Sequence, residues 1–315
     1  MKVSELISVY REALKNIYEE GELSQVIFLV LEHVKDFSKI DLAMKNEELI
    51  SDSEKEKFEH ILSELKTNKP IQYVLGVAWF SGMKLKVNEH VLIPRQETEE
   101  LVEWIYKGDG RGTGDGLRIL DICTGSGCIA LALKKKLPQS EIYALDISEQ
   151  TIAVAKENSI RNKAEVTFIL QDILQLPTSN LQPPTSNFQL PSSNLPFTDS
   201  PIHRFNILVS NPPYVLETEK QQMNNKVLNF EPHLALFVKD NDPLVFYNAI
   251  ADFALTHLKP YGELYFEINE SKGKEVKELL MSKGFSDIVV KKDLNERDRM
   301  VKAILKPNEQ LKNKN

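Results

Sequence analysis

Apolar residues recur at helical spacing in the first part of the chain and predict three helices. The first runs over residues 3–17 and is stopped by Gly21, because a glycine commonly ends a helix. The second covers residues 24–37. The third begins after Ser51, which can form a capping box with Glu54. This pattern predicts a small all-helical N-terminal domain.

The helical domain is expected to cover residues 1–70, and residues 71–96 are expected to form a hairpin linker. Apolar residues on both sides of Asn88-Glu89 predict a two-stranded β-hairpin with its turn at that dipeptide, through Leu85, Val87, Val91 and Leu92. Pro94 then interrupts the strand, and the acidic residues that follow it open another helix.

The rest of the chain, residues 97–307, alternates between apolar strands and amphipathic helices. Such alternation predicts an α/β domain with a doubly wound, Rossmann-like parallel sheet. The predicted strands cover residues 118–122, 141–145, 166–170, 205–210, 262–268, 287–291 and 300–305. The helices between them cover residues 128–136, 149–162 and 244–258, with another ending at residue 283.

Two segments interrupt this alternation without adding chemistry. Residues 108–116 are rich in glycine, but they precede a strand instead of following one, so they predict a flexible linker and not a nucleotide loop. Residues 177–197 repeat a seven-residue unit three times and are rich in Pro, Ser and Asn. Because the units are few and polar, residues 177–201 predict a disordered surface insertion and not a solenoid.

Composition is that of an ordinary soluble globular protein, with 42% hydrophobic and 27% charged residues among 315. The net charge of −7 gives no basic footprint for duplex DNA. The two cysteines and six histidines do not form a metal-binding pattern, so we expect no metal. No signal peptide and no apolar run of membrane-spanning length is evident, which predicts a cytoplasmic protein with no membrane partner.

A glycine turn follows the first predicted strand of the α/β domain, as Cys123-Thr124-Gly125-Ser126-Gly127. Gly125 and Gly127 let the backbone pass under a ligand without a Cβ in the way. The spacing lacks the full dinucleotide fingerprint, and we expect no third glycine to pack the helix, so a pyrophosphate is not required.

Carboxylates close the next two predicted strands. Asp146 can accept hydrogen bonds from both hydroxyls of a ribose. Asp172 can accept from an exocyclic adenine amine while Ile173 packs on the ring. A nucleoside site without phosphates points to S-adenosylmethionine as cofactor. A nicotinamide cofactor is disfavoured, because nothing in the sequence serves hydride transfer.

The fourth predicted strand ends in Asn211-Pro212-Pro213-Tyr214. The prolines stiffen the backbone after the strand, at the edge where open α/β sheets place ligands. The segment offers an amide side chain, carbonyl oxygens and an aromatic face, which suit a planar amino group. Asn211, Pro212, Pro213 and Tyr214 are therefore predicted to bind substrate, with Asn211 also beside the cofactor.

These features resemble the release-factor glutamine N5-methyltransferases (the HemK/PrmC family), and the resemblance covers nearly the whole chain. The other segments that carry it are Pro70 to Gly76, Leu92-Ile93-Pro94-Arg95, Glu231-Pro232-His233-Leu234-Ala235-Leu236, Glu267 and Asp298-Arg299. The family fold implies a seven-stranded sheet with an antiparallel last strand. Two residues depart from the family pattern, since Cys123 is often glycine there and Gln96 is often proline.

The resemblance implies the substrate and the catalytic roles. The substrate would be the glutamine of a Gly-Gly-Gln loop in class I peptide chain release factors. The side-chain oxygen of Asn211 and the carbonyl of Pro212 would accept the two N–H bonds of that glutamine, while Tyr214 packs on its amide plane. The catalytic residues would be Asn211, Pro212 and Tyr214, and the helical domain would recognise the release factor. We expect a monomer that binds no nucleic acid directly.

Two other functions fit the same segment after the fourth strand. An adenine-N6 methyltransferase acting on DNA or RNA would hold a planar amine in the same way, but it would usually carry a basic face. A module that only binds S-adenosylmethionine would need no intact Asn-Pro-Pro-Tyr segment. Methyl transfer from labelled cofactor to a release factor or to an oligonucleotide separates these functions.

Overall fold

A computed structural model describes residues 1–108, 116–176 and 204–306 of the protein. They form two compact units. The helical unit comprises Met1–Val77, Val87–Glu89 and Gln222–Glu231, and the α/β unit comprises Ala78–Lys86, His90–Gln221 and Pro232–Asn315. Most of the predicted glycine-rich linker and the predicted repeat insertion lie outside the described residues. Within these ranges, every helix is too short or too polar to cross a lipid bilayer.

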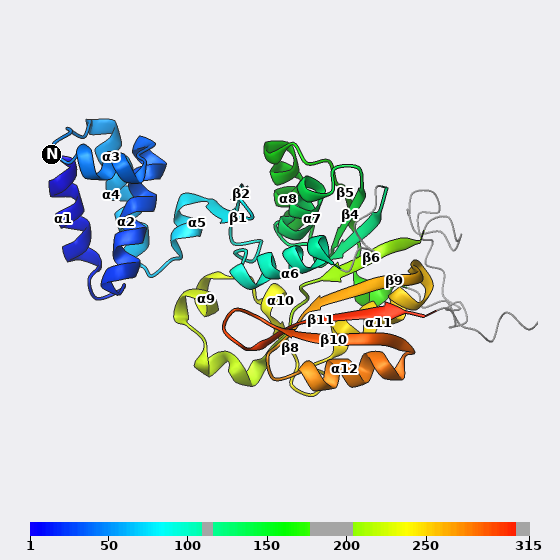
Figure 1. Cartoon of the computed structure of the whole chain (residues 1–315). Helices are drawn as coiled ribbons and strands as arrows, with labels where there is room; N and C mark the ends of the chain where they lie inside the picture. The colour runs from blue at the N-terminus through cyan, green and yellow to red at the C-terminus, as the bar shows by residue number, and fades with distance from the viewer. Residues whose placement is uncertain (109–115, 177–203, 307–315) are drawn as a thin grey trace, which may run out of the picture. The chain divides into compact units, whose positions relative to one another are not determined.

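The N-terminal helices share one apolar core, with α1 to α4 drawn in blue and α5 in cyan in Figure 1. Their bounds are α1 Val3–Leu14, α2 Glu20–Lys35, α3 Lys39–Met44, α4 Asp52–Lys66 and α5 Ile71–Leu75. Tyr10 of α1 is buried, and its hydroxyl donates to the Phe58 carbonyl of α4 over 2.6 Å. The predicted capping box is confirmed, because Ser51 Oγ accepts from the Glu54 N–H while the Glu54 carboxylate accepts from the Ser51 N–H.

The predicted boundary between the first two helices is wrong. Helix α1 ends at Leu14, and Gly21 lies in the first turn of α2 instead of stopping a helix. The apolar pattern misled the prediction because Tyr18 continues it from the connecting turn and is buried in the same core. Acidic residues, among them Glu20 and Glu22, open α2, where they favour the positive end of the helix dipole.

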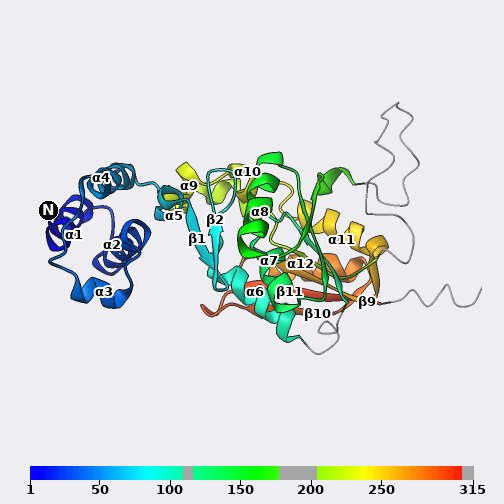
Figure 2. The ribbon, with the colours of Figure 1, turned by 90° about the horizontal axis from the view of Figure 1, so that it is seen from above.

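A hairpin is present in the predicted linker, but it is not the predicted one, because Val91 and Leu92 lie in no strand. Strands β1 Val77–Phe80 and β2 Met83–Lys86 pair through Ser81 and Gly82, which both have positive φ, 46° and 73° (Figure 2). Two left-handed residues are typical of tight hairpin turns, and Ser-Gly supplies them. The turn expected at Asn88-Glu89 is wrong, because apolar alternation continues past the end of β2 and does not locate a turn.

Seven strands form the sheet of the α/β unit, in the order β10-β11-β9-β6-β3-β4-β5 (Figure 1). Neighbouring strands from β9 to β5 run parallel, whereas β11 is antiparallel to both of its neighbours. The strands are β3 Arg118–Ile122, β4 Glu141–Asp146, β5 Thr167–Leu170, β6 Phe205–Ser210, β9 Leu258–Glu267, β10 Phe285–Lys292 and β11 Asp298–Leu305. This confirms the predicted α/β class and the antiparallel last strand.

Helices cover both faces of the sheet. They are α6 Gln96–Lys107, α7 Cys128–Lys136, α8 Glu149–Asn162, α11 Val245–His257 and α12 Gly273–Ser282. Ile119 of β3 shares one buried core with side chains of α6 and α7, and Leu120 shares the other with side chains of α11 and α12. Because successive strand residues point to opposite faces, β3 is buried on both sides and connects the two cores.

The segment after β6 contains short elements that the sequence pattern does not predict. They are β7 Val215–Leu216, the 3-10 helix η3 Glu217–Gln222, α9 Asn225–Phe230, α10 His233–Leu236 and β8 Phe237–Val238. Helix α9 belongs to the helical unit although it lies far from that unit in sequence. The segment is too polar and its elements too short for a periodic signal.

Candidate active site

The ends of neighbouring strands bring the predicted site residues to one edge of the sheet. Ile122 of β3 pairs with Ser210 of β6, so the residues after them, Cys123 and Asn211, begin adjacent loops. The Ser210 hydroxyl also donates to the Ile122 carbonyl over 2.6 Å. Asp146 closes β4, the strand on the other side of β3. Both predicted binding segments therefore lie at the carboxyl edge, where open α/β sheets hold their ligands.

The glycine turn is held against the end of β4. The Thr124 N–H donates to the Leu145 carbonyl, and the Gly125 N–H donates to the Asp146 carboxylate, both over 3.0 Å. Gly125 has a φ of +57°, and a Cβ built there would meet no atom of the described residues within 4 Å. Among the described residues, the space in front of the Gly125 backbone is therefore open, while the side chains of Thr124 and Ser126 are buried.

Gly127 has a packing role as well. Its φ is +82°, and a Cβ there would meet the Ala155 Cβ of α8 at 3.3 Å and a Leu131 methyl at 3.4 Å. This glycine therefore lets the start of α7 approach α8 closely. The packing comes from the second glycine of the turn and not from a third one, and the spacing alone did not predict it because it does not show which helix lies alongside.

Cys123 has a left-handed backbone, with φ of +62°. A residue with a Cβ loses roughly 1–2 kcal/mol in this conformation, because the Cβ comes too close to the following carbonyl oxygen. Glycine, which the resemblance leads one to expect at this position, has no Cβ and would adopt this conformation without that cost. The thiol side chain is half-buried and packs against the core beneath α11 and α12.

The two carboxylates at the ends of β4 and β5 differ in their surroundings. Asp146 accepts from the N–H groups of Gly125 and Ser148, and burial raises its pKa. Asp172 is half-buried and accepts from the Leu174 N–H over 2.9 Å. Ile173, expected to pack on an adenine ring, is buried in the core with 5% of its surface exposed. Both Asp146 and Asp172 therefore place carboxylate oxygens at the carboxyl edge of the sheet.

Asp121 is a site residue that the sequence analysis missed. It is fully buried in β3, where Oδ2 accepts from the Thr124 hydroxyl over 2.6 Å and from the Ala130 N–H over 3.3 Å. Its Oδ1 has no hydrogen-bond partner among the described residues. Burial raises the pKa of Asp121 to about 7. An unpaired buried carboxylate oxygen beneath the glycine turn fits a ligand that brings its own donor.

The Asn211–Tyr214 segment is anchored through its side chains. Asn211 Nδ2 donates to Thr98 Oγ1 of α6 over 3.2 Å, and the Tyr214 hydroxyl donates to Glu267 Oε1 of β9 over 3.0 Å. Pro212 and Pro213 are buried, whereas Asn211 and Tyr214 are half-buried. No described residue donates to Asn211 Oδ1. The segment thus keeps one amide oxygen available at the edge of the sheet.

Glu267 joins the two ends of this segment. Its Oε2 accepts from the Thr98 hydroxyl over 2.6 Å, and its Oε1 accepts from Tyr214. Both Glu267 and Thr98 are buried, with 1% and 2% of their surfaces exposed. Burial raises the pKa of Glu267, while the hydrogen bonds from Thr98 and Tyr214 and the charge of Arg299 lower it.

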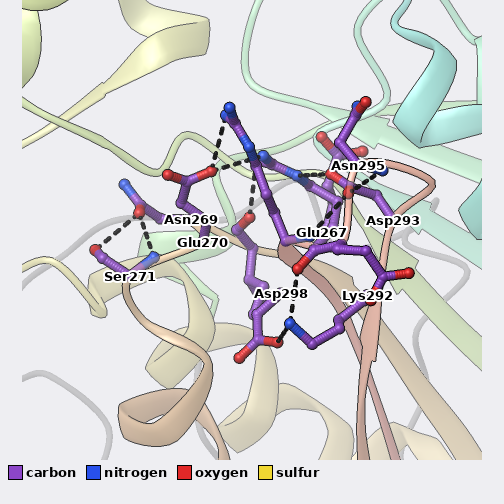
Figure 3. A network of polar contacts seen from close by, with 12 residues as sticks. Glu267, Asn269, Glu270, Ser271, Lys292, Asp293, Asn295 and Asp298 are labelled. Atoms are coloured by element: carbon purple, nitrogen blue, oxygen red, sulfur yellow. Dashed lines mark hydrogen bonds and ion pairs between the residues drawn. The ribbon is translucent and has the colours of Figure 1, made fainter.

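A charged cluster lies beside Glu267 (Figure 3). Arg299 Nε contacts the Asp293 carboxylate at 3.3 Å, and its Nη1 lies 3.4 Å from the Ile268 carbonyl. Asn269, the second residue after Glu267, donates to the Tyr214 carbonyl over 3.3 Å and accepts from the Ser271 N–H. These contacts fix the end of β9 against the Asn211–Tyr214 segment.

The position of Thr98 could have been identified as unusual from the sequence pattern. Thr98 is one turn before Leu101 and Val102 on the buried face of α6, so a polar residue there needs a buried partner. Asp121 gives a similar signal, since it interrupts an apolar strand that is buried on both faces. Glu267 was singled out only through the family resemblance.

Comparisons with known proteins agree over nearly the whole chain. Residues 5–76 match the PrmC N-terminal domain and residues 113–264 match a methyltransferase domain. A release factor glutamine methyltransferase from Flavobacterium psychrophilum is 41% identical over 303 residues, which are 95% of this chain and 99% of that protein. The protein of the same description from Bacteroides thetaiotaomicron is 37% identical over 303 residues, covering 96% of this chain and 99% of that protein.

Proposed function

The chain belongs to the release factor glutamine methyltransferases, and from this membership we propose that it methylates the side-chain nitrogen of the glutamine in the Gly-Gly-Gln motif of class I peptide chain release factors. Its methyl donor is S-adenosylmethionine. The observation that carries the proposal is the half-buried amide of Asn211, whose nitrogen is held by Thr98 and whose oxygen remains available to accept an N–H from a substrate.

The reaction requires control of a weak nucleophile. The lone pair of a glutamine nitrogen is delocalised into its carbonyl, so the nitrogen reacts only when it is held in a suitable geometry. Asn211 Oδ1 and the Pro212 carbonyl would accept its two N–H bonds, and Tyr214 would pack on the amide plane. Each bond contributes about 1 kcal/mol of net binding. Orientation can lower a barrier by roughly 7–11 kcal/mol in the best intramolecular cases.

Tyr214 is suited to packing and not to proton transfer. Burial and the neighbouring Glu267 carboxylate raise the pKa of Tyr214, so its hydroxyl keeps its proton and donates it to Glu267 in a hydrogen bond. The hydrogen bond to Glu267 therefore holds the Tyr214 ring at its hydroxyl end. No described residue is placed by these contacts as a base for the amide, and we propose that the proton leaves the nitrogen after methyl transfer.

The residues at the glycine turn fit the cofactor. When bound, S-adenosylmethionine supplies an activated methyl group, so this chain need only bind and orient. Gly125 offers an open backbone surface, and Asp121 has an unpaired buried oxygen among the described residues. Asp146 would hold the ribose and Asp172 the adenine amine, with Cys123 to Gly127 forming the floor. The small contact surface of Ile173 limits its part in packing on the ring.

The proposal is tested with cofactor labelled in its methyl group. The full chain is incubated with an intact class I release factor, with the same factor carrying Ala in place of the motif glutamine, and with an adenine-containing oligonucleotide. We expect label only in the first sample, on the glutamine when the modified peptide is sequenced by mass spectrometry. Label in the oligonucleotide alone would instead support an adenine-N6 methyltransferase.

The proposed substrate also implies a place of action and an assembly. Release factors act in translation, so we propose that the enzyme acts in the cytoplasm. We further propose that it works as a monomer with a protein partner and without direct contact to nucleic acid. Sedimentation of the enzyme alone distinguishes a monomer from a dimer. Sedimentation with a release factor shows whether the two proteins form a complex.

A further inference from the structure

The amide of Asn211 can be useful to a substrate in only one of its two orientations. An amide side chain is planar, and its oxygen and nitrogen ends have nearly the same shape. Only the oxygen accepts an N–H bond. If the side chain turned about its last bond, the nitrogen would face the substrate amino group, and two donors would meet. Catalysis on an –NH2 group therefore needs a device that selects one orientation.

The contacts behind Asn211 supply such a device. Asn211 Nδ2 lies 3.2 Å from Thr98 Oγ1, and Thr98 Oγ1 lies 2.6 Å from Glu267 Oε2. Glu267 Oε1 lies 3.0 Å from the Tyr214 hydroxyl. Thr98 and Glu267 are shielded from water, so solvent does not replace a lost partner readily. The four side chains come from α6, β9 and the loop after β6.

The direction of each hydrogen bond follows from the number of protons. When the Glu267 carboxylate is ionised it only accepts, and both Thr98 and Tyr214 then donate to it, as the contacts show. The Thr98 hydroxyl has a single proton, and once that proton points to Glu267 its oxygen can only accept from Asn211. The nitrogen of Asn211 satisfies this demand, whereas its oxygen would face another acceptor. Glu267 thus determines the orientation of an amide that it does not touch.

We propose that Thr98 and Glu267 are positioning residues that hold the Asn211 oxygen toward the substrate nitrogen. The inference rests on the proposed function and says which residues orient the Asn211 amide. The same carboxylate also holds Tyr214, so one buried group orders both the acceptor and the aromatic face of the Asn211–Tyr214 segment. A neutral residue at position 267 would not impose the same direction on the hydrogen bonds.

The first test compares Thr98→Val with Thr98→Ser in the full chain. Valine keeps the size of threonine but removes the hydroxyl, while serine retains it. We expect Thr98→Val to lower kcat for methylation of a release factor roughly tenfold, the effect of losing about one hydrogen bond, with KM changed much less. Thr98→Ser should stay near wild type. The Kd for S-adenosylmethionine, measured by calorimetry, should be unchanged in both.

A double-mutant cycle separates orientation of Asn211 from general damage. In an Asn211→Ala background there is no amide to orient, so adding Thr98→Val should change kcat less than about twofold. Tyr247→Phe is the matched control, because it removes a buried hydroxyl that donates to the Glu267 main-chain carbonyl and leaves the carboxylate contacts intact. Its kcat should equal that of wild type. Thr98→Ala, which is smaller, replaces Thr98→Val if the latter does not fold.

Glu267→Gln provides an independent arm, because glutamine has the same shape but one donor and one acceptor end. We expect a lower kcat with an unchanged Kd for the cofactor. The inference is overturned if Thr98→Val and Glu267→Gln both retain wild-type kcat, or if Thr98→Val costs as much in the Asn211→Ala background as alone. A wild-type chain that leaves the release-factor glutamine unmethylated would overturn the proposed function itself, which is a different result.

Discussion

Cys123 shows how one residue at the end of a strand bears a local cost. Its positive φ turns the chain from β3 into the glycine turn, at a position that suits glycine better than a residue with a Cβ. The nearby Gly125 has a similar φ, and no atom in the described part of the chain lies within 4 Å of the place where its Cβ would be. The turn therefore depends more on its backbone conformation than on the side chain at position 123.

This strain predicts the effect of two substitutions at position 123. Cys123→Gly should leave the free energy of unfolding unchanged or raise it by up to about 1 kcal/mol, because relief of the left-handed strain opposes the larger entropy of an unfolded glycine. Cys123→Val should lower it by about 2 kcal/mol or more, since a β-branched side chain tolerates positive φ poorly. Urea denaturation measures both, and equal stabilities for the two variants would contradict the account.

Asp121 predicts a dependence of stability on pH. Burial raises its pKa from 3.8 to about 7, so the folded protein holds this proton more tightly than the unfolded chain does. The stabilisation is present below about pH 4 and is lost as the pH rises through 7. Asp121→Asn cannot ionise. Between pH 5 and pH 8 its unfolding free energy should therefore fall less than that of wild type, by on the order of 2 kcal/mol.

Urea denaturation of both proteins without cofactor at the two pH values gives this difference directly. The comparison cancels the titration of Asp146 and Glu267, whose pKa values are also raised by burial and which both variants share. Parallel losses of stability in the two proteins would show that Asp121 is already ionised at pH 5 in the folded state.

At the scale of elements, the approach of α7 to α8 depends on one glycine. A methyl group at Gly127 would press on Ala155 at 3.3 Å and would also require a φ of +82°. Gly82 in the hairpin turn has a comparable φ of +73°, but a Cβ there would meet none of the residues that the structure describes within 4 Å. The two glycines therefore share the conformational cost of substitution and differ in the packing cost.

We expect Gly82→Ala to lower the free energy of unfolding by roughly 1–2 kcal/mol, the cost of a left-handed residue with a Cβ. Gly127→Ala should lower it by at least about 1 kcal/mol more, because α7 and α8 must separate or strain. Thermal and urea unfolding of both variants check this. Equal losses would mean that the two helices yield without cost.

The same elements show what the sequence could predict. The strand from residue 118 and the helix from Cys128 were predicted correctly because apolar runs and glycine turns are local signals. The Asn211–Tyr214 segment was also located correctly at the edge of the sheet. The hairpin turn at Ser81-Gly82 is a local feature, but the apolar alternation that continues past it placed the predicted turn elsewhere. The packing role of Gly127 and the partnership of Thr98 with Glu267 depend on residues distant in sequence, and no local pattern encodes those neighbours.

At the scale of the whole molecule, the two units are interleaved along the chain. The helical unit contains Gln222–Glu231, which follows the Asn211–Tyr214 segment in sequence. Lys226 of this segment pairs with Glu22 of α2 at 3.0 Å, and its Nζ lies 3.7 Å from the centroid of the Tyr18 ring. Deleting the N-terminal helices would therefore also remove the packing partner of α9, so a point substitution is the cleaner probe.

Lys226→Ala should loosen this segment without affecting the sheet. A partly exposed ion pair contributes about 0–1 kcal/mol and a cation–π contact about 0.5–1 kcal/mol, so amide hydrogen exchange over residues 222–231 should quicken several-fold. Amides of β3 and β6 should keep their wild-type protection. Lys274→Ala, which changes an exposed lysine of α12, is the control and should alter neither region. Unchanged exchange in Lys226→Ala would show that other contacts hold α9.

The central claim is that Asn211 orients the substrate nitrogen, and single-turnover methylation of an intact release factor by Asn211→Ala tests it most directly. With saturating cofactor, the account predicts that the rate falls roughly a hundredfold or more, as expected when a reacting group loses its alignment. The Kd for S-adenosylmethionine should stay within several-fold of wild type, and the residual methyl group should appear on the same glutamine. A wild-type rate in Asn211→Ala, with the modified residue unchanged, would contradict the account.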